Sequence, residues 1–322
     1  MDDVEAFCRA LWRHESKVIA ALAPRVDPNA RDRWGNTPLL MAAQYGDLSL
    51  VARLVHRGGD VDQQRKHLTP ITLAARRQAL DIVNFLRASG ASESIVTWIH
   101  LGQRIRCEQE LARDPTLVRL RDEGGTPLLH HAAEALQCEL VELLLDNGAT
   151  VFDADPDGET ALHRLADMRQ APQAPAAKMA TLLLDRGADP NACNWDDVTP
   201  LHQAVRARNL AVVELLLARG ADPNARDKLR GSTPLRRAIA ATGAGGTAGT
   251  GAMMVPLARI LLEYGADPDA RDKRGIPVHA SATAPEVRAV LDEHRRAKRD
   301  ANAARHEGGP AKRKPPRRKP SI

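Results

Sequence analysis

Apolar positions along the chain fall into pairs of short helical patterns. In the clearest pair, Leu201, Ala204 and Val205 are spaced as one face of a short helix. A second helix is marked by five further apolar positions: Val212, Val213, Leu215, Leu216 and Leu217. A single hairpin of two such helices cannot bury its apolar side, so neighbouring hairpins must stack on one another. The pattern therefore predicts an all-α array of helical hairpins.

Recurring dipeptides mark where these helices begin and end. Thr-Pro precedes the first helix of most units, with Thr37, Thr69, Thr126, Thr199 and Thr233 as its threonines and Thr160-Ala161 and Ile276-Pro277 as variants. Threonine is a good N-cap, and proline is tolerated in the first turn because the N–H that it lacks would have no intrahelical partner. Glycine ends the second helix in the left-handed conformation, and an Asp-Pro-Asn stretch then leads the chain away.

These signals divide the chain into an N-terminal cap at 2–30, seven repeats and a C-terminal cap at 271–294. The repeats are predicted at 31–62, 63–91, 92–122, 123–154, 155–192, 193–225 and 226–270. The apolar face of the C-terminal cap is expected to consist of Val287, Val290 and Leu291.

Several units depart from the pattern. The third lacks Thr-Pro and ends without glycine, and Ile95, Val96, Trp98 and Ile99 are expected to form its first helix. The fourth is one residue longer after Thr126, which predicts a local bulge. Insertions at 171–177 and 242–252 fall between the two expected helices of the fifth and seventh repeats.

The complete pattern is D-x-x-G-x-T-P-L-H-x-A-A followed by V-x-L-L-L-x-x-G-A-D-P-N, and it resembles the ankyrin repeat. The best copies lie at 199–225 and 126–149, and the resemblance covers about 1–294. It implies an ankyrin-repeat solenoid of stacked helix-turn-helix units with β-turn fingers. It also implies a concave protein-binding face, made by the fingers and the first helices. His163, His202 and His279 would then link neighbouring turns through backbone hydrogen bonds.

The finger tips provide the candidate partner-binding residues. Trp34 and Trp195 are two of only four tryptophans, and packing does not require them at a tip. An exposed tryptophan that anchors a partner contributes about 2 kcal/mol or more. The alternative is that each ring lies flat on its own repeat. The other candidates are polar or charged: Arg33, Asn36, Lys66, His67, Glu123, Asp157, Asp196, Lys228, Arg230, Lys273 and Arg274.

Charge alternates along these tips. It is basic near 31–67, acidic in the middle of the chain and basic again from 226. We therefore expect a partner that is acidic at both ends of its contact surface and basic in the middle.

The overall charge of +5 comes from the C-terminal tail. Residues 295–322 hold eleven basic and two acidic residues, or +9, which leaves −4 on 1–294. The tail is rich in proline and has no apolar face, so we expect it to be disordered. It could keep the protein soluble, contact nucleic acid or an acidic protein loosely, or act as a nuclear address in a eukaryotic cell.

No catalytic, cofactor or metal site is predicted. The glycines at 243–251 lack the G-K-[ST] of a phosphate loop, and the four cysteines form no C-x-x-C pair. His130 and His131 are adjacent on a helix and diverge by about 100°, so they do not converge on one ion. No segment approaches a membrane span, and the acidic start Met1-Asp2-Asp3 does not favour a secretory signal.

The sequence thus predicts a non-catalytic protein-binding module, acting as an adaptor, an inhibitor or an immunity-type partner. We expect it to be monomeric and cytoplasmic and to recognise another protein on its concave face. The alternative is a nucleic-acid-associated or nucleus-targeted ankyrin protein that uses its basic tail.

Overall fold

The computed structural model describes residues 3–65, 68–122, 124–169, 172–239 and 251–307, of which 251–253 and 301–307 are described by their backbone alone. In these ranges the regular elements are helices, and β pairing is limited to isolated bridges in the finger turns. The prediction of an all-α array of helical hairpins is therefore confirmed. The chain divides into two compact units, Met1–Ala221 and Asp222–Ile322.

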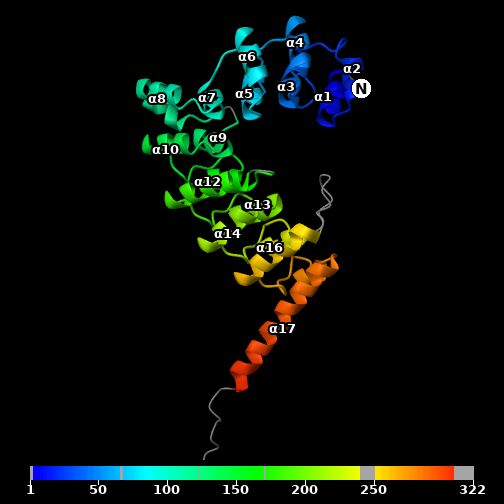
Figure 1. Ribbon diagram of the computed structural model, residues 1–322, viewed down its shortest axis with the longest axis vertical. Coiled ribbons are helices and arrows are strands. Elements are labelled where there is room, and N and C mark those ends of the chain that lie inside the picture. The colour runs from blue at the N-terminus through cyan, green and yellow to red at the C-terminus, as the bar shows by residue number, and fades with distance from the viewer. Residues whose placement is uncertain (1–2, 66–67, 123, 170–171, 240–250, 308–322) are drawn as a thin grey trace, which may run out of the picture. The chain divides into compact units, whose positions relative to one another are not determined.

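The first unit is a row of helix pairs (Figure 1). Their bounds are α1 Asp3–Trp12 and α2 Ser16–Leu22, α3 Pro38–Tyr45 and α4 Leu48–His56, α5 Pro70–Arg76 and α6 Leu80–Ala88, α7 Ile95–His100 and α8 Arg104–Arg113, α9 Leu128–Glu134 and α10 Cys138–Asp146, α11 Ala161–Ala166 and α12 Gln173–Asp185, and α13 Pro200–Ala207 and α14 Leu210–Ala218. Each first helix from α1 to α13 contacts the next first helix, and the second helices pack in a layer beside them.

The second unit begins with α15 Pro234–Ile239 and α16 Gly251–Glu263. A short 3₁₀ helix, η2 Val278–Ser281, and the long α17 Pro285–Glu307 follow. Helix α16 packs against α15 and α17, and the predicted apolar face of the last cap is confirmed, because Val287, Val290 and Leu291 are buried.

Helix ends follow the chemistry of the repeated signals. The Thr37 hydroxyl accepts a hydrogen bond from the Leu40 N–H, with proline in the first turn behind it. At the other end of a hairpin, Gly148 adopts a φ of 98°. The N–H groups of Gly148 and Ala149 then bond to the carbonyls at the end of α10, which is the Schellman pattern.

The core lies between the two helix layers of each unit. Leu201, Ala204 and Val205 on α13 are buried, and so are Val212 and Leu216 on α14. The third repeat packs in the same way through α7, as predicted, although α8 ends at Arg113 and passes into a 3₁₀ helix, η1 Pro115–Arg119. Stacking, and not helix propensity alone, holds such short helices in place.

The fourth repeat contains no bulge. Its finger turn runs from Asp122 to Thr126, as long as the turn from Asp32 to Asn36, and the two ends of each turn are joined by the same backbone hydrogen bond. Its Thr-Pro dipeptide lies one position early, so that Pro127 occupies the N-cap of α9. The extra residue therefore shifts the dipeptide without distorting the helix.

The insertion at 171–177 was expected to lie between two helices. From Gln173 onward it is instead part of helix α12. Helix α12 is extended at its start, with Pro172 as N-cap, because the alanine-rich stretch favours a helix and a proline in the first turn is tolerated. Of the insertion at 242–252, residues 242–250 lie outside the described residues. Helix α16 begins at Gly251.

The basic tail also differs from expectation over its first part. Helix α17 continues to Glu307, so residues 295–307 are helical and not disordered. Alanine and arginine predominate there and are strong helix formers. Residues 308–322 lie outside the part of the chain that the structure describes.

Candidate protein-binding surface

Several finger turns are closed by the side chain of their first residue. In the turn at 32–36, Asp32 Oδ1 accepts hydrogen bonds from the N–H groups of Trp34 (2.9 Å) and Asn36 (2.8 Å). The same two hydrogen bonds, from the N–H groups two and four residues later in the chain, are accepted by the side chains of Asp122, Asp155, Asn194 and Asp272. These side chains therefore shape the turns, while residues at the tips, such as Trp34 and Asp196, are exposed.

Trp34 is anchored at the tip of the first finger and remains 52% exposed. The Arg33 guanidinium lies 4.0 Å from the centre of its ring, and Arg33 is also paired with Glu5 at 3.2 Å. Arg65 of the next finger donates a hydrogen bond to the Trp34 carbonyl (3.0 Å). The finger is thus fixed by its neighbour, while Trp34 remains exposed.

Trp195 is held by the preceding finger. Its indole Nε1 donates to the Pro156 carbonyl (2.7 Å), and its backbone N–H donates to the Asp157 carbonyl (3.2 Å). The ring lies close against Gly158, where an added Cβ would come within 2.9 Å of it. The side chain is nevertheless 66% exposed. The ring is therefore both oriented and accessible.

The other candidate residues divide into three groups. Asp157 and Asp196 are exposed at their tips, and so are four residues of the second unit: Lys228, Arg230, Lys273 and Arg274. Asn36 is a correction, because it is buried and its amide donates to Asp32 Oδ2 (2.8 Å) within its own finger. Lys66, His67 and Glu123 lie outside the described residues.

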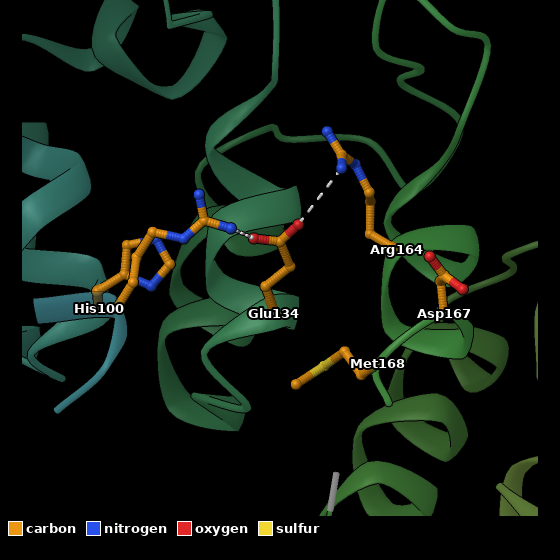
Figure 2. Close-up of a pocket in the computed structure, with 6 residues that line it drawn as sticks. His100, Glu134, Arg164, Asp167 and Met168 are labelled. Carbon is orange, nitrogen blue, oxygen red and sulfur yellow. Dashed lines mark hydrogen bonds and ion pairs between the residues drawn. The ribbon is translucent and has the colours of Figure 1, made fainter. Parts of the chain in front are cut away.

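A charged cluster on the first helices was missed by the sequence analysis (Figure 2). Arg76 ends α5 and lies 3.0 Å from Glu134, which ends α9. Arg164 on α11 approaches the other oxygen of the same carboxylate at 3.7 Å. Asp167, directly after α11, is paired with Arg206 of α13 at 2.7 Å. Ion pairs therefore connect the second, fourth, fifth and sixth repeats.

Arg164 is the centre of this cluster. It is paired with Asp155 (3.1 Å) and Glu159 (3.7 Å) as well as with Glu134. Burial lowers the pKa of Arg164, but the three carboxylates raise it further, so the guanidinium stays charged. Burial raises the pKa of Glu159 above its usual range, although Arg164 opposes this change.

A cavity of about 290 Å³ lies beside the cluster and is lined by Arg76, His100, Glu134, Arg164, Asp167 and Met168. A shared repeat position could have pointed to it, since Arg76 and Glu134 each directly follow an Ala-Ala pair. The sequence pattern did not show that these side chains converge, because that depends on how the repeats stack.

The repeated histidines are structural. His163 Nδ1 accepts a hydrogen bond from the Thr160 N–H (3.2 Å), and its Nε2 donates to the Val198 carbonyl of the next finger (3.0 Å). His130 reaches the Glu159 carbonyl in the same way (2.8 Å). His279 instead lies in η2, near the Pro268 carbonyl. Burial lowers the pKa of His163, which favours the neutral ring.

No helix in the described ranges combines the length and the apolar character that crossing a membrane requires. The helix with the greatest length, α17, is strongly charged.

Comparison with known proteins identifies the repeats. The family model "Ankyrin repeats (3 copies)" matches residues 7–97, 88–192, 129–227 and 170–272. The human protein "SH3 and multiple ankyrin repeat domains protein 2" is 29% identical over 210 residues, which cover 62% of this chain and 11% of that protein. Mouse Inversin is 29% identical over 197 residues, covering 57% of this chain and 18% of the relative.

Two further similarities cover more of the other protein. Mouse "NF-kappa-B inhibitor delta" is 29% identical over 188 residues, which cover 55% of this chain and 54% of that protein. The solved ankyrin repeat domain of Bcl-3 is 27% identical, with a TM-score of 0.47, covering 80% of this chain and 99% of that one. The chain spans less than a fifth of the first two relatives, so it is similar to one part of each.

Proposed function

The chain belongs to the ankyrin-repeat family, whose members are protein-interaction modules, and we propose that it binds another protein on the concave face formed by its fingers and first helices, without catalysis. The observation that carries this proposal is Trp195, a large aromatic side chain that two hydrogen bonds hold in a mostly exposed position. Aromatic anchors of this kind dominate the energy of protein interfaces.

Fixed orientation makes Trp195 suited to this role. A flexible side chain loses rotamer freedom when a partner immobilises it, at a cost of about 0.5–1.5 kcal/mol. The hydrogen bond from the indole to the Pro156 carbonyl already imposes that restriction in the free chain. Binding therefore gains the burial of the ring with a smaller loss of entropy.

The charged cluster on the first helices supports a partner that carries both signs of charge. Arg76, Glu134, Arg164 and Asp167 line one cavity, and the ion pairs among them keep the side chains ordered in the free chain. A partner side chain entering the cavity would exchange one ion pair for another, which contributes to specificity more than to affinity.

Among the three roles expected from the sequence, we favour inhibitor over adaptor or immunity-type partner. The support is the similarity to the mouse protein "NF-kappa-B inhibitor delta". The matched segment covers about half of that protein. The inhibited protein must be identified by partner capture, because ankyrin surfaces of one fold recognise many targets.

The test is partner capture from the native host followed by affinity measurement. Trp195→Ala should weaken binding by about 2 kcal/mol or more, or roughly thirtyfold. Phe152→Ala is the matched control, since Phe152 is 68% exposed and lies in a turn outside the fingers. Equal affinities of the two variants would contradict the proposal.

The alternative function, nucleic-acid association through the basic tail, is separated by a truncation. The truncation should begin at 308, because residues 295–307 belong to α17, where Arg295 is paired with Asp269 at 2.9 Å. Removing 308–322 should leave a concave-face complex intact. A complex driven by the tail would be lost and would weaken steeply with salt.

A further inference from the structure

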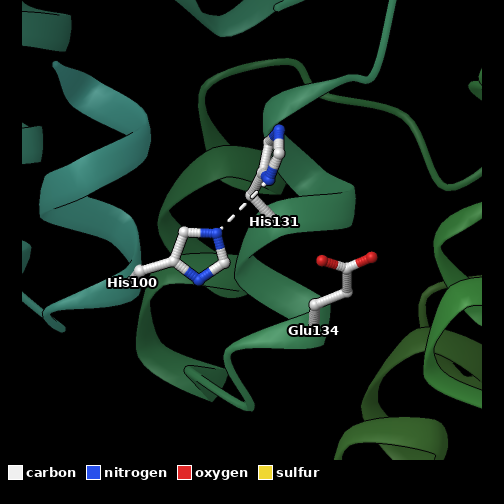
Figure 3. A group of neighbouring side chains, drawn as sticks. All are labelled: His100, His131 and Glu134. Atoms are coloured by element: carbon white, nitrogen blue, oxygen red, sulfur yellow. Dashed lines mark hydrogen bonds between the residues drawn. The ribbon is translucent and has the colours of Figure 1, made fainter. Parts of the chain in front are cut away.

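Two histidines and a glutamate converge between the third and fourth repeats (Figure 3). His100 is the last residue of α7, whereas His131 and Glu134 both lie on α9. One potential ligand atom from each side chain lies within 4.8 Å of the others. Both histidines are buried and Glu134 is half-buried, so the group is part of the folded framework and not a chance meeting of mobile side chains.

The fold explains why they meet. His131 and Glu134 are three positions apart on one helix, so their side chains lie on the same face. Helices α7 and α9 are first helices of adjacent repeats and pack against one another. His100 precedes His131 by 31 positions, about one repeat length, and stacking therefore brings it to the same level.

The distance between the two rings suits a shared metal ion. His100 Nε2 lies 3.4 Å from His131 Nδ1. Two nitrogens that bind one tetrahedral zinc ion at about 2.0–2.1 Å are roughly 3.3–3.4 Å apart. An ion between the rings would replace this hydrogen bond, and the hydrogen on His100 Nε2 would move to the other nitrogen of that ring.

The orientation of His131 is fixed by a carboxylate. Its Nε2 lies 2.8 Å from Asp122 Oδ2, and both groups are buried. Because Nε2 donates its hydrogen to Asp122, Nδ1 is the ring atom that faces His100. A carboxylate that orients a histidine from behind is the usual second partner of a metal-binding histidine.

We propose that His100, His131 and Glu134 form a binding site for a divalent cation of the zinc class. The donor set of two imidazoles and one carboxylate is typical of zinc sites that keep a fourth position open. His100 and Glu134 also line the 290 Å³ cavity, which leaves room for water or an incoming side chain at that position. The site does not depend on the proposed protein-binding function.

Arg76 competes with the ion for Glu134. Its guanidinium lies 3.0 Å from the Glu134 carboxylate. Binding of the cation requires the carboxylate to turn from Arg76 toward the two rings. The alternative is that the His100–His131 contact is only a structural hydrogen bond, with Arg76 and Glu134 as a surface ion pair.

The first experiment is titration of the full chain with zinc after removal of metal by a chelator, in the presence of a non-coordinating reductant. One ion per chain should bind, and cobalt(II) in its place should give the intense visible spectrum of tetrahedral coordination. His131→Ala should reduce affinity more than tenfold. His56→Ala, which removes a histidine on α4 that contacts the Ala52 carbonyl, should not change it.

The second experiment separates the two interpretations with surface variants that retain the buried histidines. Glu134→Gln and Arg76→Gln both break the same ion pair, so a purely structural cluster predicts that neither affects metal binding. A metal site predicts opposite effects: Glu134→Gln weakens zinc binding because a ligand is lost, and Arg76→Gln strengthens it because a competitor is removed. Changes of the same sign, no change, or an octahedral cobalt spectrum would overturn the proposal.

Discussion

The guanidinium of Arg76 lies 3.0 Å from the carboxylate of Glu134, although the two residues are 58 positions apart in the sequence. Helix α7 packs between the helices that carry them, so the long arginine side chain reaches across one whole repeat. The contact links the second and fourth repeats directly, whereas solenoid stability otherwise depends on nearest neighbours.

This contact should contribute little to stability. A double-mutant cycle with Arg76→Ala and Glu134→Ala, followed by chemical denaturation in the presence of a chelator, should give a coupling of about 0.2–1 kcal/mol, because the arginine is substantially exposed and screened by solvent. A coupling of several kcal/mol would show that the pair behaves as a buried one.

Gly158, in the finger that holds Trp195, should be sensitive to substitution. Gly158→Ala places a methyl group within 2.9 Å of the Trp195 ring at a φ of 78°, and we expect a loss of about 1–3 kcal/mol in the free energy of unfolding. Gly148→Ala is the control, because Gly148 has a similar positive φ and open space around it. Equal losses would mean that backbone strain alone, and not the ring contact, decides the effect.

Stability should fall as the pH drops below about 6.5, in part because of His163. Burial lowers the pKa of this histidine in the folded chain, while the Val198 carbonyl and the Asp155 carboxylate oppose the change less strongly. The unfolded chain therefore takes up the proton more readily, so stability is complete above the unfolded pKa and is lost below it.

The variant His163→Gln isolates this contribution. Melting temperatures measured between about pH 7.5 and pH 5.5 should decline less for the variant than for the natural chain. A parallel decline of the two proteins would assign the pH dependence to other groups.

Charge reversal at the two exposed acidic tips tests the expected charge pattern of the partner. Asp157→Lys with Asp196→Lys should weaken binding and slow association, because the middle of the partner's contact surface is expected to be basic. Neither side chain closes its finger turn, a role that belongs to Asp155 and Asn194, so folding should be unaffected. Unchanged affinity would remove the charge-pattern hypothesis.

The sequence by itself determined the helical hairpins and the family. Thr-Pro before a first helix and glycine after a second act within a few residues, through N-caps such as Thr37 and left-handed turns such as Gly148. Signals of such short range are readable without knowledge of the rest of the chain. The shifted Thr-Pro of the fourth repeat was the exception, because its register is set by the closure of the Asp122 turn.

Only the tertiary structure decided which side chains meet. His100 comes from the third repeat and meets His131 and Glu134 of the fourth, and Arg76 and Arg164 come from two further repeats, so the stacking of first helices brings them together. The adjacent pair His130 and His131 drew attention in the sequence, yet each ring finds its partners elsewhere. The physical reason is that helical periodicity fixes the face on which a side chain lies, whereas its distance to another repeat depends on how closely the helices between them pack.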